Sequence, residues 1–357
     1  MTPIERVLDR ARWAPSGDNT QPWRFQITGE HSCIVHAFDT RRHCVYDLTG
    51  APSQVSVGAM LETARLASSG LGMRAEIRRL PGDEENLRFD MQLREDASVR
   101  PSPLVPYIEQ RCTNRRPFSR RPLAAAEKEA LQASVGSSYR LVWLEGSMRA
   151  EVARLLFASA KVRLTIPEAF AVHRAVIEWD VKFSNTRIPA QAVGLDPVGT
   201  ALMRWAMKSW RRTNILSNYL GGTLLPRLQL DYLPGIGCAA HVMVVGDKPA
   251  ASIDHFLDAG AAVQRLWLTA TRLGLQHQPE MTPLIFAGYS RTGTQFSRSP
   301  GALLQAEAVR KRLDQLVTVE VAERAVWLGR LGQAAPPEAR SLRRPLNELT
   351  VSEPISR

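Results

Sequence analysis

Apolar side chains open the chain at the spacing of one helical face, at Ile4, Val7, Leu8 and Ala11. We therefore expect a short helix that ends before Pro15 and Gly17, because both residue types break helices. From Trp23 to Ile27 apolar and polar residues alternate as in a half-buried strand, and the stretch from His31 to Phe38 alternates in the same way. This pattern predicts a helix, an irregular connection and two strands.

A second apolar helical pattern occurs twice in the chain. Residues 58–73 align with residues 260–275 at an offset of 202, and glycine matches glycine at both ends. Each copy is typical of an apolar helix that ends at a glycine suited to the left-handed conformation, Gly72 in one copy and Gly274 in the other. The match favours one structural element present twice, although helical patterns rich in alanine and leucine also match by chance.

The two copies also locate an insertion. Residues 5–8 match residues 129–132 at an offset of 124, so the second copy is longer by 78 residues between Ser138 and Gly260. We place the extra segment at about residues 162–237. Inside it, helical spacing gives a methionine-rich and aromatic face made of Met203, Ala206, Met207 and Trp210. Such a face is typical either of a lid over a binding site or of an ordinary core.

Length and composition narrow the class of protein. A chain of 357 residues that is 44% hydrophobic is long enough for one large core or for two ordinary domains. Its four cysteines form no CxxC pair, which argues against a disulfide framework or a zinc ribbon and favours a reducing compartment. No signal-peptide pattern opens the chain, and no apolar run reaches the length that spans a bilayer. We therefore expect a cytoplasmic protein with no membrane partner.

The formal net charge of +11 is the main electrostatic feature of the sequence. The arginines are spread along the chain instead of forming one block, and no zinc finger, RNP-like strand or helix-turn-helix signature accompanies them. A basic cleft raises the local concentration of anionic ligands. We therefore expect a phosphate-bearing cofactor or an anionic substrate, and no nucleic-acid partner.

The segment from Pro15 to Trp23 contains the most specific motif, Pro-Ser-Gly-Asp-Asn-Thr-Gln-Pro-Trp. It leaves Ser16, Asn19 and Gln21 on an exposed connection, where each can hydrogen-bond the edge of a planar heteroaromatic ring. The same residue types also favour an ordinary helix-to-strand turn. The motif resembles the flavin loop of the nitroreductase superfamily.

A second motif, Arg-Cys-Thr-Asn-Arg-Arg-Pro-Phe at residues 111–118, precedes a helical pattern over residues 124–131. It resembles the opening motif of a nitroreductase subunit, but here it follows the flavin-type loop instead of preceding it. Together with the repeat, the resemblance implies an α+β protein with a nitroreductase-like three-layer fold. Two halves, residues 1–105 and 106–357, are expected to be fused as an internal pseudo-dimer, with the insertion as a helical lid.

The resemblance also implies one FMN site. In family homodimers each FMN lies at the subunit interface, between the flavin loop of one subunit and the arginine motif of the other. A fused chain with one copy of each therefore keeps one complete site. The matching turn of the second half, near residues 136–138, lacks the loop motif and is expected to be inactive.

Two later segments complete the expected site. The segment after the second repeat resembles the family pattern Leu-Gly-x-x-x-x-Pro, whose backbone lies along the flavin ring. The C-terminal segment resembles the family's closing phosphate contact, although a solvated basic tail has the same composition. The cofactor-binding residues implied by the resemblance are Ser16, Asn19, Gln21, Arg111, Thr113, Arg115, Pro279, Glu280, Met281, Ser341 and Arg343.

Other kinds of site have less support in the sequence. A group of histidines and cysteines lies between His31 and Cys44, but its spacing fits no closed zinc site. His277 is expected to be an ordinary hydrogen-bonded surface residue. The sequence has no Gly-x-Gly-x-x-Gly loop, Walker loop or Gly-x-Ser-x-Gly elbow. We expect no metal and no catalytic side chain.

The resemblance implies an FMN-dependent oxidoreductase that reduces an electron-poor small molecule, such as a nitro compound or a quinone, with NAD(P)H as the candidate hydride donor. Two alternatives stay open. The fused arrangement and lid also resemble the Acg-type nitroreductase-like proteins, which implies FMN sequestration or storage with little turnover. A lidded flavin also suits tailoring of a biosynthetic intermediate. One chain is expected to suffice for one flavin site, and further self-association stays open.

Overall fold

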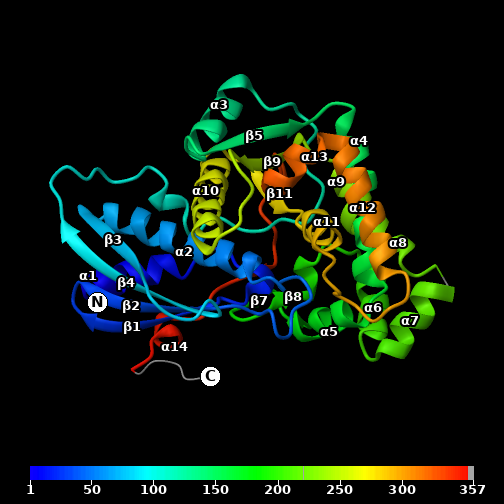
Figure 1. The fold of residues 1–357 in the computed structure, drawn as a ribbon, viewed down its shortest axis with the longest axis horizontal. Helices are drawn as coiled ribbons and strands as arrows, with labels where there is room; N and C mark the ends of the chain where they lie inside the picture. The colour runs from blue at the N-terminus through cyan, green and yellow to red at the C-terminus, as the bar shows by residue number, and fades with distance from the viewer. Residues whose placement is uncertain (220, 353–357) are drawn as a thin grey trace.

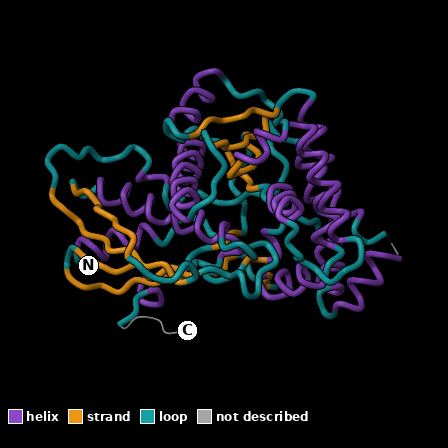
Figure 2. The backbone as a smooth tube through the Cα atoms, in the orientation of Figure 1, coloured by secondary structure: helices purple, strands orange, loops and turns teal. Residues whose placement is uncertain are grey.

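A computed structural model describes residues 1–219 and 221–352, which form two antiparallel four-stranded sheets with surrounding helices (Figure 1 and Figure 2). The expected mixture of helices and sheets is confirmed. The first sheet has the order β1-β2-β4-β3, with β1 (Trp23–Gly29), β2 (Ser32–Phe38), β3 (Met73–Leu80) and β4 (Asn86–Glu95). Its main helices are α1 (Pro3–Ala11) and α2 (Ala51–Ser69). The helix and both strands predicted near the start of the chain are therefore present.

The second sheet repeats the connectivity of the first. Its strands are β5 (Tyr139–Leu144), β9 (Ala240–Gly246), β10 (Gln276–Pro279) and β11 (Ala325–Gly332), in the order β10-β11-β9-β5. Its corresponding helices are α3 (Ala125–Ser134) and α10 (Ile253–Arg272). If the strands of each sheet are numbered along the chain, both sheets have the order 1-2-4-3.

Helices α2 and α10, the two copies of the repeat, pack against each other (Figure 1). A Cβ atom on Gly58 would lie 2.0 Å from the carbonyl oxygen of Leu257, and one on Gly260 would lie 2.0 Å from that of Val55. These two approaches are reciprocal, because each glycine meets the residue three positions before the other. Both predicted left-handed glycines also occur, with φ of +68° at Gly72 and +71° at Gly274.

The two sheets differ in the segments that join their strands. Strands β1 and β2 are joined by a tight turn, whereas the equivalent β5 and β9 are separated by residues 145–239. This separation contains the segment expected as an insertion, residues 162–237. Its elements are α4 (Met148–Leu164), α5 (Pro167–Val176), β6 (Ile177–Glu178), β7 (Phe183–Ser184), β8 (Ile188–Pro189), α6 (Pro197–Ala206), α7 (Trp210–Tyr219), α8 (Leu224–Arg227), the π-helical turn η4 (Leu228–Tyr232) and α9 (Leu233–Ile236).

A second long connection separates β10 from β11. It contains α11 (Thr282–Thr292), α12 (Ala302–Val317) and α13 (Val319–Arg324), whereas β3 and β4 form a hairpin joined by residues 81–85. The second half is therefore longer at this connection as well, beyond the 78 residues that the offsets place before Gly260. The repeat match ends at residue 275, so its offset contains no information about this later connection.

After β11 the chain returns to the first sheet. Strand β12 (Arg340–Ser341) pairs in parallel with β7, and α14 (Leu346–Leu349) contacts α1 and β1. The backbone N–H of Val351 donates to the carbonyl oxygen of Phe25 at 2.9 Å. The C-terminal segment therefore lies beside the loop between α1 and β1, and this return brings Arg343 to Ala14 of that loop, 329 positions away in sequence.

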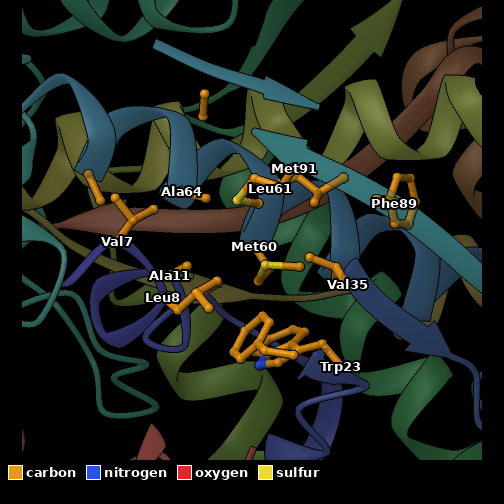
Figure 3. Packing of buried hydrophobic residues seen from close by; sticks show 14 of the residues in the cluster. Val7, Leu8, Ala11, Trp23, Val35, Met60, Leu61, Ala64, Phe89 and Met91 are labelled. Atoms are coloured by element: carbon orange, nitrogen blue, oxygen red, sulfur yellow. The ribbon is translucent and has the colours of Figure 1, made fainter. Parts of the chain in front are cut away.

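The core of the first half fixes both ends of the same loop. Figure 3 shows the packing of α1, α2 and the first sheet through buried residues that include Val7, Leu8, Ala11, Trp23, Val35, Met60, Leu61, Ala64, Phe89 and Met91. Burying each large apolar side chain contributes about 1.5–3 kcal/mol. Because Ala11 and Trp23 are both fully buried, residues 12–22 are held between two anchored positions.

Candidate functional site

The loop between α1 and β1 has an unusual backbone. Asp18, Asn19 and Gln21 have φ of 51°, 61° and 50°, in the left-handed region that non-glycine residues rarely adopt. The Ser16 hydroxyl accepts a hydrogen bond from the backbone N–H of Gln21 at 3.0 Å, which closes the loop on itself. Strained backbone of this kind concentrates at ligand sites, where the surrounding fold holds it in place.

This loop forms one wall of a cavity of about 900 Å³. Further walls come from the arginine motif, the turn between β10 and α11, the C-terminal segment and helices α4 to α8. Sites for drug-sized ligands and cofactors usually measure about 300–1,000 Å³. The cavity is therefore large enough for a dinucleotide-sized or flavin-sized ligand.

Eight of the eleven residues expected at the flavin site line this cavity: Ser16, Arg111, Thr113, Arg115, Pro279, Glu280, Met281 and Arg343. They come from four segments that are far apart in the sequence. An isolated parallel bridge between Thr113 and His277 fixes the arginine motif against β10. The amide of Asn114 adds a hydrogen bond to the carbonyl oxygen of Ala335 at 3.0 Å.

The other three expected residues do not line the cavity, and the expectation that Asn19 and Gln21 are exposed is wrong. Gln21 is fully buried, where its Nε2 donates to the carbonyl oxygen of Asn185 and its Oε1 accepts from the N–H of Arg344, both at 2.8 Å. The Nδ2 of Asn19 and the Oγ of Ser341 both donate to the carbonyl oxygen of Arg187, at 3.3 and 2.8 Å.

Asn19 and Gln21 instead bind neighbouring segments to the loop, and Ser341 joins two of those segments to each other. The strand segment around β7 and β8 and the returning C-terminal segment cover the outer side of the loop. The sequence around the loop could not predict that these segments cover it, because their residues lie more than 160 positions away.

Two buried arginines of the cavity have no carboxylate partner among the described residues. Arg111 and Arg343 are only 2% and 8% exposed, and their guanidinium groups donate to the carbonyl oxygens of Trp13 at 2.8 Å and Ala14 at 2.9 Å. Neither pairs with a carboxylate among the described residues, nor does the nearby Arg340. The Nε of Arg111 is buried and has no hydrogen-bond partner in the described part of the chain.

Burial and mutual repulsion destabilise the charged form of these arginines. Burial, with a further contribution from Arg340, lowers the pKa of Arg111 to about 9. Burial also holds the pKa of Arg343 well below its usual value, and Arg111, Arg340 and Arg12 act in the same direction. A bound anion would relieve both effects, because buried charges need a counter-charge or hydrogen bonds.

An aromatic cluster lies beneath Arg111. The guanidinium carbon of Arg111 is 4.6 Å from the ring centroid of Trp267, which packs edge-on against His277 at 4.9 Å. The indole N–H of Trp327 donates to the Nε2 of His277 at 3.0 Å, and burial lowers the pKa of His277 to about 3. His277 is therefore a buried, neutral residue, and the expectation that it lies at the surface is wrong.

A second buried charge network supports the turn at Glu280. Its carboxylate accepts from Arg330 at 2.9 Å and contacts His241 Nδ1 at 2.7 Å, while His241 Nε2 contacts the carbonyl oxygen of Gly235 in α9 at 2.8 Å. Burial alone would lower the pKa of His241, but Glu280 raises it to about 10. Arg330 also donates to the carbonyl oxygen of Arg115 at 2.9 Å, so this network joins three walls of the cavity.

Most of the polar groups in another part of the cavity lie outside the motifs. The Tyr46 hydroxyl lies 2.9 Å from the Nε2 of His173, and Arg163 pairs with Asp231 of η4 at 2.8 Å. Burial, with the charge of Arg163, lowers the pKa of His173 to about 3. Burial also raises the pKa of Asp18, a shift that Arg115 opposes. These residues come from four separate elements, so no spacing in the sequence could have grouped them.

The expected face of the insertion is present in part. Met203, Ala206 and Met207 line the cavity, together with neighbouring apolar residues of α6 to α8. Trp210 does not, because α6 ends at Ala206 and α7 begins at Trp210, so the helical spacing is interrupted. Its ring packs against Phe170 of α5 instead, with centroids 5.6 Å apart.

No family model matches this chain. Its sequence is 25% identical over 350 residues to an uncharacterized protein from Mycobacterium tuberculosis, in an alignment that covers 95% of this chain and 47% of that protein. The chain thus spans about half the length of this curated relative.

Solved structures of nitroreductases resemble the chain. The FMN-dependent nitroreductase NfnB from Mycobacterium smegmatis, in complex with NADPH, is 17% identical, with 71% of this chain and 98% of that chain covered and a TM-score of 0.38. A nitroreductase with bound FMN from Bacteroides fragilis is 14% identical, with 66% and 89% covered and a TM-score of 0.34. A nitroreductase-like family protein from Bacillus cereus is 12% identical, with 69% and 94% covered and a TM-score of 0.35. The chain is thus similar to solved members of the family that its motifs resemble.

Proposed function

We propose that the cavity binds FMN and that the protein is an FMN-dependent oxidoreductase of the nitroreductase type. The observation that supports this most directly is the meeting of a flavin-type loop with Arg111 and Arg343 at one cavity. Both are buried cations, and neither has a carboxylate partner in the part of the chain that the structure describes. Buried guanidinium groups with free N–H donors suit a phosphate, which accepts paired hydrogen bonds from their planar fork.

Each wall then has a part in holding the cofactor. The phosphate would lie at Arg111 and Arg343, with the field of Arg340 adding to the attraction. The ring system would lie along Pro279, Glu280 and Met281, and the side chains of Ser16, Thr113 and Arg115 would be available to its polar edges. When bound, FMN supplies the hydride transfer, and the protein supplies binding, orientation and electrostatics.

Asn19, Gln21 and Ser341 would act one step away from the cofactor. Their hydrogen bonds to the segment at residues 185–187 and to Arg344 hold the strained loop in place. We assign these residues to loop support instead of direct cofactor contact.

The further parts of the proposal follow from the duplicated connectivity. Two nitroreductase-like halves, divided near residue 105, form an internal pseudo-dimer, and the inner side of the insertion at residues 162–237 covers the cavity as a lid. NAD(P)H is the proposed electron donor and an electron-poor small molecule is the proposed acceptor. We propose no catalytic side chain, and a cytoplasmic location stays a prediction from the sequence.

One observation favours a second candidate function, FMN storage with little turnover. Apolar residues of α6 to α8 line the same cavity as the arginines, including Leu202, Met203, Met207 and Leu216. A roof of this kind would limit the approach of an electron donor or acceptor to a bound flavin.

The first test is the visible absorption spectrum of the purified protein, followed by FMN titration of the flavin-free form. A yellow protein, or a colourless one that binds added FMN, supports the proposal, and a colourless protein that binds no FMN contradicts it. Rapid mixing of the FMN-loaded protein with NADH or NADPH separates the two functions. Fast loss of flavin absorbance supports a reductase, and a tightly held flavin that stays oxidised supports storage.

A further inference from the structure

The insertion contains most of the exposed large apolar side chains of the molecule. Of the eleven such residues in the described part of the chain, six lie between α6 and α9: Val198, Trp205, Ile215, Leu224, Leu225 and Leu233. Scattered apolar residues are normal on protein surfaces, but a concentration of them in one segment marks an interaction surface. We call these six exposed residues of α6 to α9 the apolar patch.

Helix α6 has two different faces. One face lines the cavity with Leu202, Met203 and Ala206. The opposite face is exposed and carries apolar and basic residues: Val198, Ala201, Arg204, Trp205 and, just beyond the end of the helix, Lys208. An ordinary surface helix is apolar on one face and polar on the other. Helix α6 is apolar on its buried face and has large apolar groups among cations on its exposed face.

The segment that bears the patch is strongly basic. Residues 197–233 contain five arginine or lysine residues and one aspartate, Asp231, which pairs with Arg163. Lys208, Arg211 and Arg212 pair with no carboxylate of the described residues. The guanidinium carbon of Arg212 lies 5.2 Å from the ring centroid of Trp205, so a cation and an exposed aromatic ring occupy the same place.

The position of the patch suits contact with a large partner. Figure 1 shows α6, α7 and α8 at the end of the long axis that lies farthest from the first sheet, where they project beyond the second sheet. Helices that combine leucine and tryptophan with lysine and arginine lie in the interface of anionic membranes, where apolar groups enter the headgroup region and cations contact lipid charges.

We propose that the outer surface of α6 to α8 docks on an anionic lipid surface. A second copy of the chain is a poorer occupant, because a two-fold contact would bring the unpaired Lys208 and Arg211 against the same cations of the other copy. A lipid surface with negative headgroups neutralises these charges and accepts Trp205 and Leu224 at the same time.

This inference departs from the sequence prediction of no membrane partner. That prediction rests on spanning segments, and the described helices indeed include none that offers the apolar run a bilayer crossing requires. A peripheral membrane contact is instead marked by exposed apolar side chains among cations. Such side chains can be recognised on α6 only once it is known which of its faces lines the cavity. Leu225 is 39% exposed and also lines the cavity, so docking would bring one wall of the cavity next to the lipid.

The test is co-sedimentation of the full-length protein with phosphatidylcholine vesicles that contain or lack phosphatidylserine. We expect binding to the phosphatidylserine vesicles, weakened by salt, and little binding to phosphatidylcholine alone. The double variant Trp205→Ser with Leu224→Ser and the double variant Lys208→Glu with Arg211→Glu should each bind at least about tenfold more weakly.

Matched controls lie elsewhere on the molecule. Leu304→Ser removes another exposed leucine, 71% exposed on α12, and Arg6→Glu with Arg100→Glu makes the same change in net charge at exposed arginines of the first half. Both controls should bind vesicles as the unmodified protein does. Flavin-free and FMN-loaded protein are both tested, so that failure of docking is distinct from failure of the proposed FMN site.

Three outcomes would overturn the proposal: no binding to phosphatidylserine vesicles, equal binding by the patch variants, or equal loss in the controls. Sedimentation velocity adds a fourth. If the protein self-associates and the Trp205 and Leu224 variant becomes monomeric without a change in vesicle binding, the patch is a contact between copies and not a lipid surface.

Discussion

Arg111 and Arg343 are held by backbone carbonyl groups, and this arrangement separates their structural role from their proposed ligand role. Each donates to one carbonyl oxygen of the loop, so alanine would remove both a hydrogen bond and a charge. Glutamine keeps two N–H donors and removes the charge. The two roles therefore predict different results for Arg111→Gln and Arg343→Gln.

If the arginines bind the FMN phosphate, each glutamine variant should weaken FMN binding by about 1.5–3 kcal/mol. The preference for FMN over riboflavin should shrink in the variants, because riboflavin has no phosphate. The flavin-free variants should be at least as stable as the unmodified protein, since an unpaired buried charge is removed. Fluorescence titration and thermal unfolding measure these effects, with the exposed Arg100→Gln as control. Unchanged FMN affinity in both variants would show that the phosphate lies elsewhere.

His241 gives a pH-dependent prediction. Its folded-state pKa is raised from the ordinary 6.5 to about 10, so the folded protein holds a proton that the unfolded chain releases. Its contribution to stability is complete below pH 6.5 and is lost as the pH rises through about 10. His241→Gln should lower the free energy of unfolding by about 3–5 kcal/mol at neutral pH, because Glu280 loses a buried partner.

The difference between the variant and the unmodified protein should shrink between pH 6.5 and 10, which urea unfolding at several pH values would measure. The exposed His31→Gln is the control. A difference that is constant over this range would mean that His241 is neutral in the folded protein at neutral pH.

Sequence motifs predicted site residues well where the residues lie together in one short segment. They predicted poorly the hydrogen-bond partners that lie on different strands or helices. Arg111 and Arg115 are in one recognisable motif, and both line the cavity. Glu280 was expected, but its partners His241 and Arg330 lie 39 and 50 residues away on neighbouring strands, with no pattern that relates them. Gln21 has the expected identity and the opposite environment, because the burial of a loop depends on what folds over it.

At the scale of elements, the crossing of α2 and α10 depends on glycine. A methyl group on Gly58 or Gly260 would collide with backbone carbonyl groups of the other helix, which cannot move as a flexible side chain does. Gly58→Ala and Gly260→Ala should each lower the free energy of unfolding by at least about 1–3 kcal/mol.

Gly288→Ala in α11 is the matched control, because a Cβ atom there would have no neighbour within 4 Å. It should be neutral or stabilise the protein by about 0.5–1 kcal/mol, since glycine is a poor helix former. Denaturant unfolding compares the three variants. Equal stability of all three would mean that the two helices do not pack closely at the glycines.

The repeat also shows how far elements could be predicted from the sequence. Both copies are helices that end near left-handed glycines, since an apolar helix between glycines leaves a clear local pattern. The order of the strands, which is the same in both sheets, had no such pattern, because strand pairing depends on contacts between distant segments. The connection through α11 to α13 lies beyond the end of the repeat and was not predicted either.

At the scale of the whole molecule, the two halves differ in the side chains that hydrogen-bond the turn after the first helix of each half, α1 and α3. In the first half, the carbonyl groups of Trp13 and Ala14 accept from Arg111 and Arg343, which pair with no carboxylate of residues 1–219 and 221–352. In the second half, Arg265 donates to the carbonyl oxygens of residues 134 and 135 and pairs with Glu62 at 3.0 Å. The positive charge on that side is already neutralised within the protein.

An internal counter-ion removes the reason for a second phosphate to bind. We therefore expect the flavin-free protein to be saturated by one FMN per chain, whatever its state of association. Titration followed by flavin fluorescence gives the ratio, and sedimentation equilibrium gives the mass. Two FMN per chain would show that the turn at residues 134–138 is also a site. One FMN for every two chains would show that a partner must complete the cavity, which would contradict the pseudo-dimer.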